Sequence, residues 1–202
     1  MTTSVQSTVL AEHIWPTEGA SIWLKRAALV GFGILALAIA AKFRVPMWPV
    51  PATMQTFVVL SIGAAYGLRL GLVTLVGYLV LGALGVSVFA GSGEGATGLG
   101  YMLGATGGYL AGFVVAGGVM GELARRGWDK SFGKMVLAML IGNIVIYGLG
   151  LSWMAHMFLD TKGAAWVMQW GMTNFLLFDA VKLLLAAILF PSVWAMVGKA
   201  RS

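Results

Sequence analysis

The sequence has no cysteine and little charge. Of its 202 residues only 10% are charged, whereas 59% are hydrophobic. The absence of cysteine excludes disulfides and thiolate metal sites, and two histidines, His13 and His156, are too few for a histidine-based metal centre. Soluble domains are about a quarter charged, and a water-soluble fold of this length could not hide so much apolar surface. The composition therefore predicts an integral membrane protein without a metal or other cofactor.

The apolar residues form blocks that predict an all-α integral membrane bundle of six transmembrane helices. A spanning helix needs roughly 20 apolar residues, and no charge-rich stretch is long enough for a separate soluble domain. We expect a single membrane domain, residues 1–202, with a polar N-terminal segment, residues 1–23, and a bundle over residues 24–198. The polar segment lacks the basic and apolar regions of a cleavable signal peptide. The predicted spans are residues 24–41, 53–66, 70–88, 101–123, 135–158 and 172–197.

Basic residues set the expected orientation. An even number of spans puts both termini on one side; if that side is the cytoplasm, nine basic residues lie inside and three, Lys42, Arg44 and Lys162, lie outside. Because Lys and Arg favour the cytoplasmic side, we expect both termini there. The outer loops are then residues 42–52, 89–100 and 159–171. The basic residues that set the orientation also account for the net charge of +6. The sequence has no basic stripe with interleaved aromatic residues, so the charge does not indicate nucleic-acid binding.

The sharpest candidate site is Asp179 with Lys182, the only ionisable pair of an acid and a base inside a predicted span. Ionisable groups at membrane depth cost about 2.5–3.5 kcal/mol each, and at spacing i,i+3 the two share a helix face. One interpretation is a neutralised ion pair that joins the last helix to a neighbour. The other, which we favour, is a polar binding or ion site open to the outer face. A carboxylate accepts hydrogen bonds and an ammonium donates them, so the pair suits a ligand with N–H and C=O groups.

Glycines recur every four residues at Gly100, Gly104, Gly108 and Gly112. This spacing bares the backbone along one helix face and is typical of close helix packing. Tyr109 adjoins the stripe, and its amphipathic ring is a candidate flank for a ligand.

Three further features have two interpretations each. Ala36 and Ala40 in the first span have small-xxx-small spacing, which indicates either an internal contact or a docking face for another membrane protein. Asn143 near mid-span is either an interhelical hydrogen-bond partner or a ligand contact. Glu94 in the loop of residues 89–100 is either solvated or a ligand contact.

The loop of residues 89–100 lacks the Gly-Lys-Ser/Thr ending of a phosphate loop. Transport driven by ATP would therefore require another chain to hydrolyse the ATP.

Three segments carry a specific combination of motifs. They are Pro49-Val-Pro-Ala-Thr-Met-Gln-Thr-Phe, Gly77-Tyr-Leu-Val-Leu-Gly-Ala-Leu-Gly-Val-Ser-Val-Phe-Ala-Gly and Gly104-Ala-Thr-Gly-Gly-Tyr-Leu-Ala-Gly-Phe. Over most of its length the chain resembles the BioY family, the biotin-capturing subunits of energy-coupling-factor (ECF) transporters. Two positions depart from the family pattern, Ser87 and Ala105, where proline is usual; both lie at loop edges and affect loop rigidity.

The resemblance implies a six-helix fold in a bacterial cell (inner) membrane, with an outward-facing biotin pocket that loops cover. It implies as partners a transmembrane coupling subunit and two ATPase subunits. The pattern at Ala36 and Ala40 resembles the one that such proteins use to dock the coupling subunit. It implies that biotin is bound through the acid and base of the last helix, the glycine–tyrosine motif and the glutamine motif after the prolines. The expected substrate contacts are Asp179, Lys182, Tyr109, Gly108, Phe89, Glu94, Gln55, Thr53 and Asn143.

Other functions predict different behaviour. A stand-alone secondary transporter would use Asp179 as its proton or sodium site and would need an ion gradient but no ATPase. A structural assembly subunit would bind no small solute. Ser152 and His156 at i,i+4 could mimic a nucleophile and base, but no supporting acid or oxyanion geometry accompanies them, so we expect no enzyme.

Overall fold

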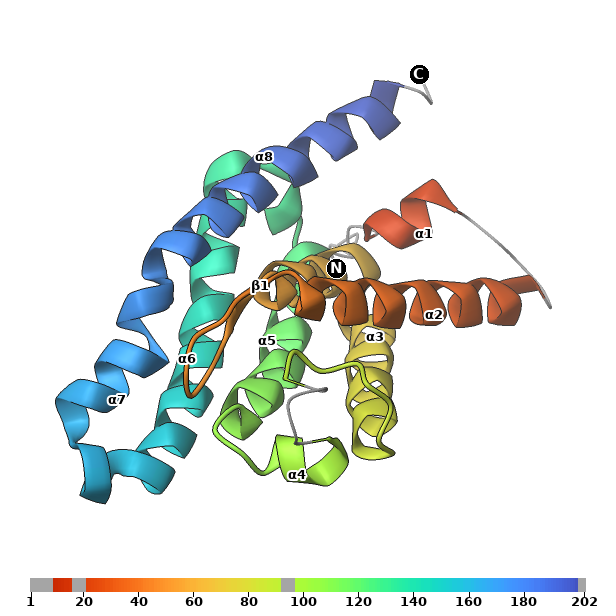
Figure 1. Cartoon of the computed structure of the whole chain (residues 1–202). Coiled ribbons are helices and arrows are strands. Elements are labelled where there is room, and N and C mark those ends of the chain that lie inside the picture. The colour runs from red at the N-terminus through yellow and green to blue at the C-terminus, as the bar shows by residue number, and fades with distance from the viewer. Residues whose placement is uncertain (1–8, 16–20, 92–96, 200–202) are drawn as a thin grey trace, which may run out of the picture.

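The structure is a computed structural model that describes residues 9–15, 21–91 and 97–199. Helices make up nearly all of it (Figure 1). The α-helices are α1 (Leu10–Ile14), α2 (Ser21–Lys42), α3 (Gln55–Ala83), α4 (Gly98–Met102), α5 (Gly107–Arg125), α6 (Phe132–Lys162), α7 (Ala164–Gly171) and α8 (Leu176–Lys199). The short 3-10 helices are η1 (Trp128–Lys130) and η2 (Thr173–Phe175), and the strands are β1 (Arg44–Val45) and β2 (Ala52–Thr53).

Five helical segments among the described residues are long and apolar enough to cross a membrane. Their mean hydropathy is between 1.3 and 2.1, which matches the apolar blocks expected from the sequence. The prediction of an all-α membrane bundle is therefore confirmed. The segments are Ser21–Lys42, Gln55–Ala83, Gly107–Arg125, Phe132–Lys162 and Ala164–Gly198.

The long helix α3 turns back on itself at Gly67, where the backbone has φ 73° and ψ −180°. A Cβ built on Gly71 would lie 3.5 Å from the Cα of Gly63. In a straight helix, residues eight apart are separated by about 12 Å, at 1.5 Å per residue. The two arms of α3 therefore lie side by side, and the turn agrees with the break predicted between residues 66 and 70. Only glycine adopts this φ without strain.

Helix α5 lies between α3 and α6 in the core of the bundle. Glycines make this possible: a Cβ on Gly112 would come within 2.9 Å of the Cα of Ile146 on α6, and one on Gly108 would collide with the carbonyl of Leu149. The predicted close packing is confirmed for these two positions. The four-residue stripe is shorter than predicted, because Gly100 belongs to α4 and Gly104 to the turn before α5.

Several helix ends differ from the expected boundaries. The third span was expected to reach residue 88, but α3 ends at Ala83, and Gly85 follows with φ +93°. A glycine in this left-handed conformation is a common helix terminator. The outer loop expected over residues 159–171 is wrong: α6 continues to Lys162, Gly163 (φ +81°) breaks the helix, and α7 follows.

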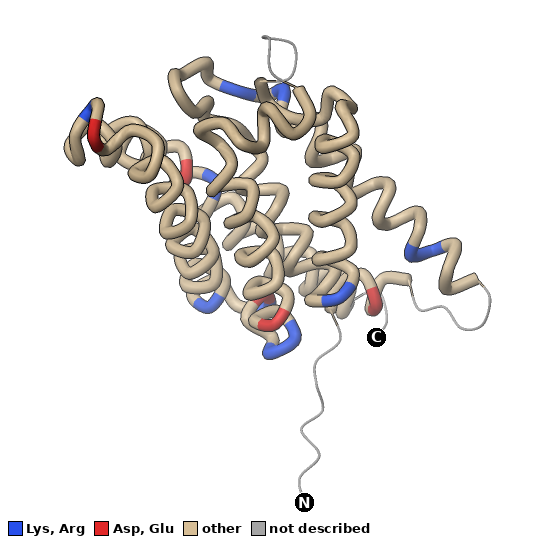
Figure 2. Tube along the Cα trace, turned by 90° about the horizontal axis from the view of Figure 1, so that it is seen from below, with Lys and Arg blue, Asp and Glu red and all other residues tan. Residues whose placement is uncertain are grey.

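The segment between α2 and α3 is a short hairpin. Arg44 of β1 pairs with Thr53 of β2, and Val45 pairs with Ala52. The prolines predicted to break the helix lie between the two strands. This hairpin delivers Thr53 and the start of α3 to the site described below. Charged residues gather mostly towards the ends of the bundle (Figure 2).

Candidate functional site

A cavity opens between the hairpin and the helices α3, α5, α6 and α8. The space between its walls is about 560 Å³ when the open mouth is counted. Within this space, the centre of a water molecule can occupy a volume of about 60 Å³. Its walls are mostly apolar, with a polar group at one side, which is the usual make-up of a small-molecule site. The lining residues are Val50, Pro51, Ala52, Thr53, Gln55, Thr56, Ala90, Tyr101, Thr106, Tyr109, Leu110, Phe113, Ile146, Tyr147, Phe175, Asp179 and Lys182.

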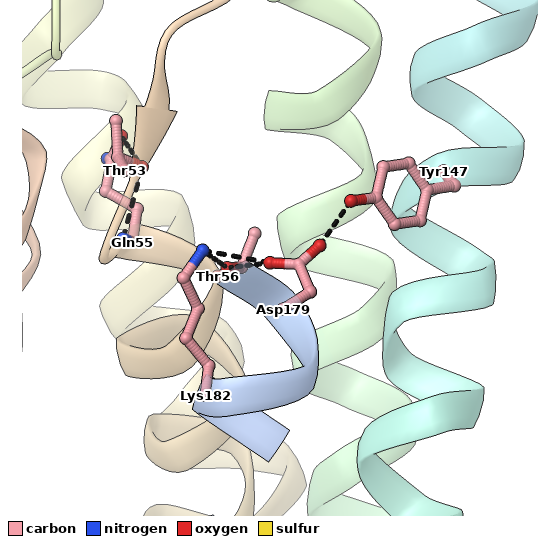
Figure 3. Close-up of polar contacts among 6 residues, drawn as sticks. All are labelled: Thr53, Gln55, Thr56, Tyr147, Asp179 and Lys182. Carbon is pink, nitrogen blue, oxygen red and sulfur yellow. Dashed lines mark hydrogen bonds and ion pairs between the residues drawn. The ribbon is translucent and has the colours of Figure 1, made fainter. Parts of the chain in front are cut away.

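Asp179 and Lys182 form a buried ion pair at the wall of this cavity (Figure 3). The Lys182 ammonium lies 2.9 Å from Oδ1 of Asp179, and the two side chains are 9% and 8% exposed. Lys182 also donates to Oγ1 of Thr56 at 3.0 Å, and the hydroxyl of Tyr147 donates to Oδ2 of Asp179. The carboxylate thus has partners from three helices, α3, α6 and α8.

The position of the pair follows from the helix ends. Asp179 lies in the first turn of α8, where the positive end of the helix dipole stabilises a carboxylate. Thr56 lies in the first turn of α3, directly after the hairpin. Because the beginnings of α3 and α8 meet at the cavity, residues 123 positions apart come within hydrogen-bond reach.

Gln55 and Thr53 form a second polar group at the cavity wall. The side-chain amide of Gln55 donates a 2.6 Å hydrogen bond to the hydroxyl of Tyr78. The hydroxyl of Thr53 lies 3.4 Å from Oε1 of Gln55 and accepts the backbone N–H of the same residue at 3.2 Å. Both residues therefore line the cavity with their polar atoms held in place.

Aromatic rings form the apolar side of the cavity. Tyr109 is one of the lining residues. Its hydroxyl is held by other groups: it donates to the carbonyl of Gly171 at 2.7 Å and lies 3.2 Å from the sulfur of Met154. Tyr101 lines the cavity as well, and Phe89 stacks behind it at 5.0 Å between ring centroids. Phe89 is thus a support for the wall and is not among the lining residues.

A second, outer pocket adjoins the cavity and shares Pro51, Tyr101 and Thr106 with it. It leaves about 310 Å³ for the centres of water molecules and is lined by the hairpin and the segment before α5. Arg44 is the charged side chain among its described lining residues. At the rim, Trp48 of the hairpin contacts Phe158 and Trp166, at 6.2 and 5.6 Å between ring centroids.

The predicted site residues divide into two groups. Asp179, Lys182, Tyr109, Gln55 and Thr53 meet at the cavity.

Three other described residues do not line the cavity. Phe89 lies behind Tyr101; Gly108 packs on α6; and Asn143 has a buried carbonyl oxygen without a hydrogen-bond partner there. Glu94 lies outside the described residues.

The alanines predicted for docking face inward. Ala40 is 4% exposed and Ala36 is half-buried, so packing within the chain already covers much of this pair.

Sequence reasoning missed Thr56, Tyr147 and Tyr78. Tyrosines of membrane proteins usually lie at the interfaces, where the ring is half in water. Tyr147 and Tyr78 instead lie well inside long apolar segments. A tyrosine so far inside an apolar segment predicts a buried hydroxyl with a specific hydrogen-bond partner, and this pattern could have identified both residues.

Known proteins are similar to this chain over most of its length. The sequence model of the BioY family matches residues 7–199. The probable biotin transporter BioY of Pyrococcus horikoshii is 36% identical over 166 residues, 82% of this chain and 93% of that protein. The biotin transporter BioY of Thermotoga maritima is 33% identical over 153 residues, 76% of this chain and 86% of that protein.

A solved structure has the same fold. It is the crystal structure of the S-component for biotin from an ECF-type ABC transporter, with a TM-score of 0.73 over 89% of this chain and 95% of that chain. The two sequences are 19% identical, so this likeness concerns the fold.

Proposed function

The chain belongs to the BioY family, and we propose that it binds biotin from the outer face of the membrane and delivers it inward together with an ATP-driven coupling module. The observation that carries the proposal is the buried pair of Asp179 and Lys182 at the wall of a largely apolar cavity. As a member of a transporter family, the chain is a substrate-binding component and not an enzyme.

The polar groups of the cavity match the ureido ring of biotin, which has two N–H donors and one carbonyl acceptor. Oδ2 of Asp179 receives one hydrogen bond, from Tyr147, and a carboxylate oxygen has room for a second. An ammonium has three hydrogens, and Lys182 uses two of them on Asp179 and Thr56 among the described contacts. Asp179 would accept from a ureido N–H, and Lys182 would donate to the ureido carbonyl.

The apolar parts of biotin match the aromatic wall. The fused rings would pack against Tyr101, Tyr109 and Phe113, which line the cavity. The aliphatic tail would extend into the outer pocket, where the guanidinium of Arg44 suits a terminal carboxylate. The contact of Trp48 with Phe158 and Trp166 would hold the hairpin over the bound ligand.

The proposal includes six membrane crossings with both termini in the cytoplasm. The turn at Gly67 supports two crossings by α3, one for each arm. The excess of basic residues in the segments assigned to the inside supports the orientation.

The coupling module would consist of a transmembrane subunit and two ATPase subunits. The chain lacks a Gly-Lys-Ser/Thr phosphate loop, which agrees with ATP hydrolysis on another chain. Docking through Ala36 and Ala40 stays a prediction. Because Ala40 is buried, docking through this pair would require the segments that cover Ala40 to move.

Calorimetric titration of the purified chain with biotin tests the proposal, with riboflavin as an unrelated control. We expect saturable binding of biotin alone. Asp179→Asn should weaken it by two orders of magnitude or more, since losing one partner of a buried pair costs about 3–5 kcal/mol. Asp160→Asn, at the exposed end of α6, is the matched control and should bind like the wild type. Full-strength binding by Asp179→Asn would refute the role of the pair.

A further inference from the structure

A chain of hydrogen bonds leads away from the cavity through Tyr78. The amide of Gln55 donates to the Tyr78 hydroxyl at 2.6 Å, and this hydroxyl donates to the carbonyl of Val88 at 3.0 Å. Tyr78 is 1% exposed and is not among the residues that line the cavity. Among the hydrogen bonds of the described residues, the one with Gln55 connects Tyr78 to the cavity wall.

The donors and acceptors along this series of hydrogen bonds can be assigned in only one way. A backbone carbonyl has no hydrogen to give, so the single hydroxyl hydrogen of Tyr78 must be donated to Val88. The Tyr78 oxygen then acts as an acceptor towards Gln55. Of the two ends of the Gln55 amide, only the NH₂ group is a donor, so that end must face Tyr78.

The other end of the amide is thereby fixed. Oε1 of Gln55 lies on the side of Thr53, at 3.4 Å from its hydroxyl, and both residues line the cavity. A carbonyl oxygen has two lone pairs, and a hydrogen bond of this length is weak. Oε1 is therefore available to a ligand N–H.

We infer that Tyr78 is a positioning residue: through its bonds to Gln55 and Val88 it turns the amide so that the site offers an acceptor and selects ligands that donate an N–H. This inference rests on the proposed biotin site and adds a determinant of its specificity. With Asp179, the cavity then has two acceptors for the two ureido N–H groups and one ammonium for the carbonyl.

The chain also connects the site to the segment after α3. Val88 belongs to residues 84–91, which follow the end of α3 at Ala83. Phe89, the next residue, packs edge-on against Tyr78 and stacks on Tyr101. Movement of this segment would release the Tyr78 hydroxyl and with it the orientation of Gln55.

A double-mutant cycle between Tyr78→Phe and Gln55→Ala tests the inference. Phenylalanine keeps the ring contact with Phe89 and removes only the hydroxyl. Because one hydrogen bond contributes about 0.5–1.5 kcal/mol, we expect Tyr78→Phe to weaken biotin binding about two- to twelvefold. In the Gln55→Ala background, the same change should alter affinity by less than about twofold, since the amide it orients is gone.

The control is Tyr66→Phe, which removes another tyrosine hydroxyl bound to a backbone carbonyl, that of Leu29 at 3.0 Å, away from the cavity. It should leave biotin affinity unchanged. A second readout uses biotin methylated on a ureido nitrogen, in the two positional isomers. For the isomer that lacks the N–H facing Gln55, the effect of Tyr78→Phe should vanish. An equal loss of affinity in both backgrounds and for both isomers, or no loss at all, would overturn the inference.

The hydrogen-bond chain is also testable without ligand. In thermal unfolding of the ligand-free protein, Tyr78→Phe and Gln55→Ala should be non-additive, and additivity would overturn the chain itself. If the wild type binds no biotin, the proposed function fails, while this unfolding cycle still decides whether Tyr78 orients Gln55.

Discussion

The hydroxyl of Tyr109 donates a 2.7 Å hydrogen bond to the carbonyl of Gly171. This bond joins the first turn of α5 to the last residue of α7, from which η2 leads into α8, the helix of Asp179 and Lys182. Close packing accompanies it, because a Cβ on Gly171 would lie 3.0 Å from the same hydroxyl. The tyrosine of the glycine–tyrosine motif therefore contributes its ring to the cavity and its hydroxyl to the placement of α8.

Tyr109→Phe should separate these two contributions. The ring remains, so we expect biotin affinity to fall less than for Tyr109→Ala. Stability should fall by about 0.5–1.5 kcal/mol, since the carbonyl of Gly171 loses its partner. Thermal unfolding and calorimetric titration of both variants measure the two effects. Equal affinity losses for Tyr109→Phe and Tyr109→Ala would assign the ligand contact to the hydroxyl instead.

Neutralising one member of the buried pair should be worse for stability than neutralising both. Lys182→Met leaves the Asp179 carboxylate buried without its cation, at a cost of about 3–5 kcal/mol. The double variant Asp179→Asn, Lys182→Met removes both charges, and its new amide can still accept from Tyr147. We expect its unfolding midpoint to lie closer to the wild type, although neither variant should bind biotin. A double variant less stable than Lys182→Met would contradict the energetic argument.

The contact between α5 and α6 should not tolerate a methyl group at Gly108. Its Cβ would collide with the carbonyl of Leu149 and with Trp153. Overpacking of this kind costs about 1–3 kcal/mol, so Gly108→Ala should lower the unfolding midpoint. Gly148→Ala on α6 is the matched control, because nothing lies within 4 Å of its added Cβ. That variant should be as stable as the wild type or gain about 0.5–1 kcal/mol from helix propensity.

Asp129 should make stability depend on pH. It lies in η1, between two membrane-spanning helices, and is 1% exposed. Burial raises the pKa of its carboxyl above 3.8, although the N–H of Trp194, which donates at 2.6 Å, acts in the opposite direction. In the window from 3.8 up to the raised pKa, the folded state binds more protons than the unfolded state. Stability should therefore fall as pH rises through this window.

The variant Asp129→Asn isolates that contribution, since an amide stays neutral and its oxygen can still accept from Trp194. Unfolding midpoints measured over a pH series should fall less steeply for Asp129→Asn than for the wild type. Parallel curves for the two proteins would show that another group causes the dependence.

Hydropathy was sufficient to predict the helical segments, because a membrane helix must be apolar over its own length whatever its neighbours do. The boundaries were harder, since they depend on single glycines. Gly85 and Gly163 end helices through positive φ values, which a run of apolar residues does not reveal. For the same reason residues 164–171, an apolar helix, were mistaken for part of a loop.

The site was predictable to the extent that its residues lie close together in the sequence. The i,i+3 spacing of Asp179 and Lys182 was enough to predict their ion pair. The bond from Tyr147 crosses between two helices and joins residues 32 positions apart, so it depends on how the helices pack. Thr56 is a similar case, and only the tertiary structure assigns it to the pair.

The make-up of the cavity wall has a consequence for the rate of ligand exchange. Val50, Pro51, Ala52 and Thr53 near the end of the hairpin and Ala90 of the segment after α3 lie on one part of the wall, whereas α5, α6 and α8 supply another part. Connections between helices move more readily than the packed helices that they join. Exchange of a molecule in the cavity should therefore depend on motion of these two connections and not on rearrangement of the bundle.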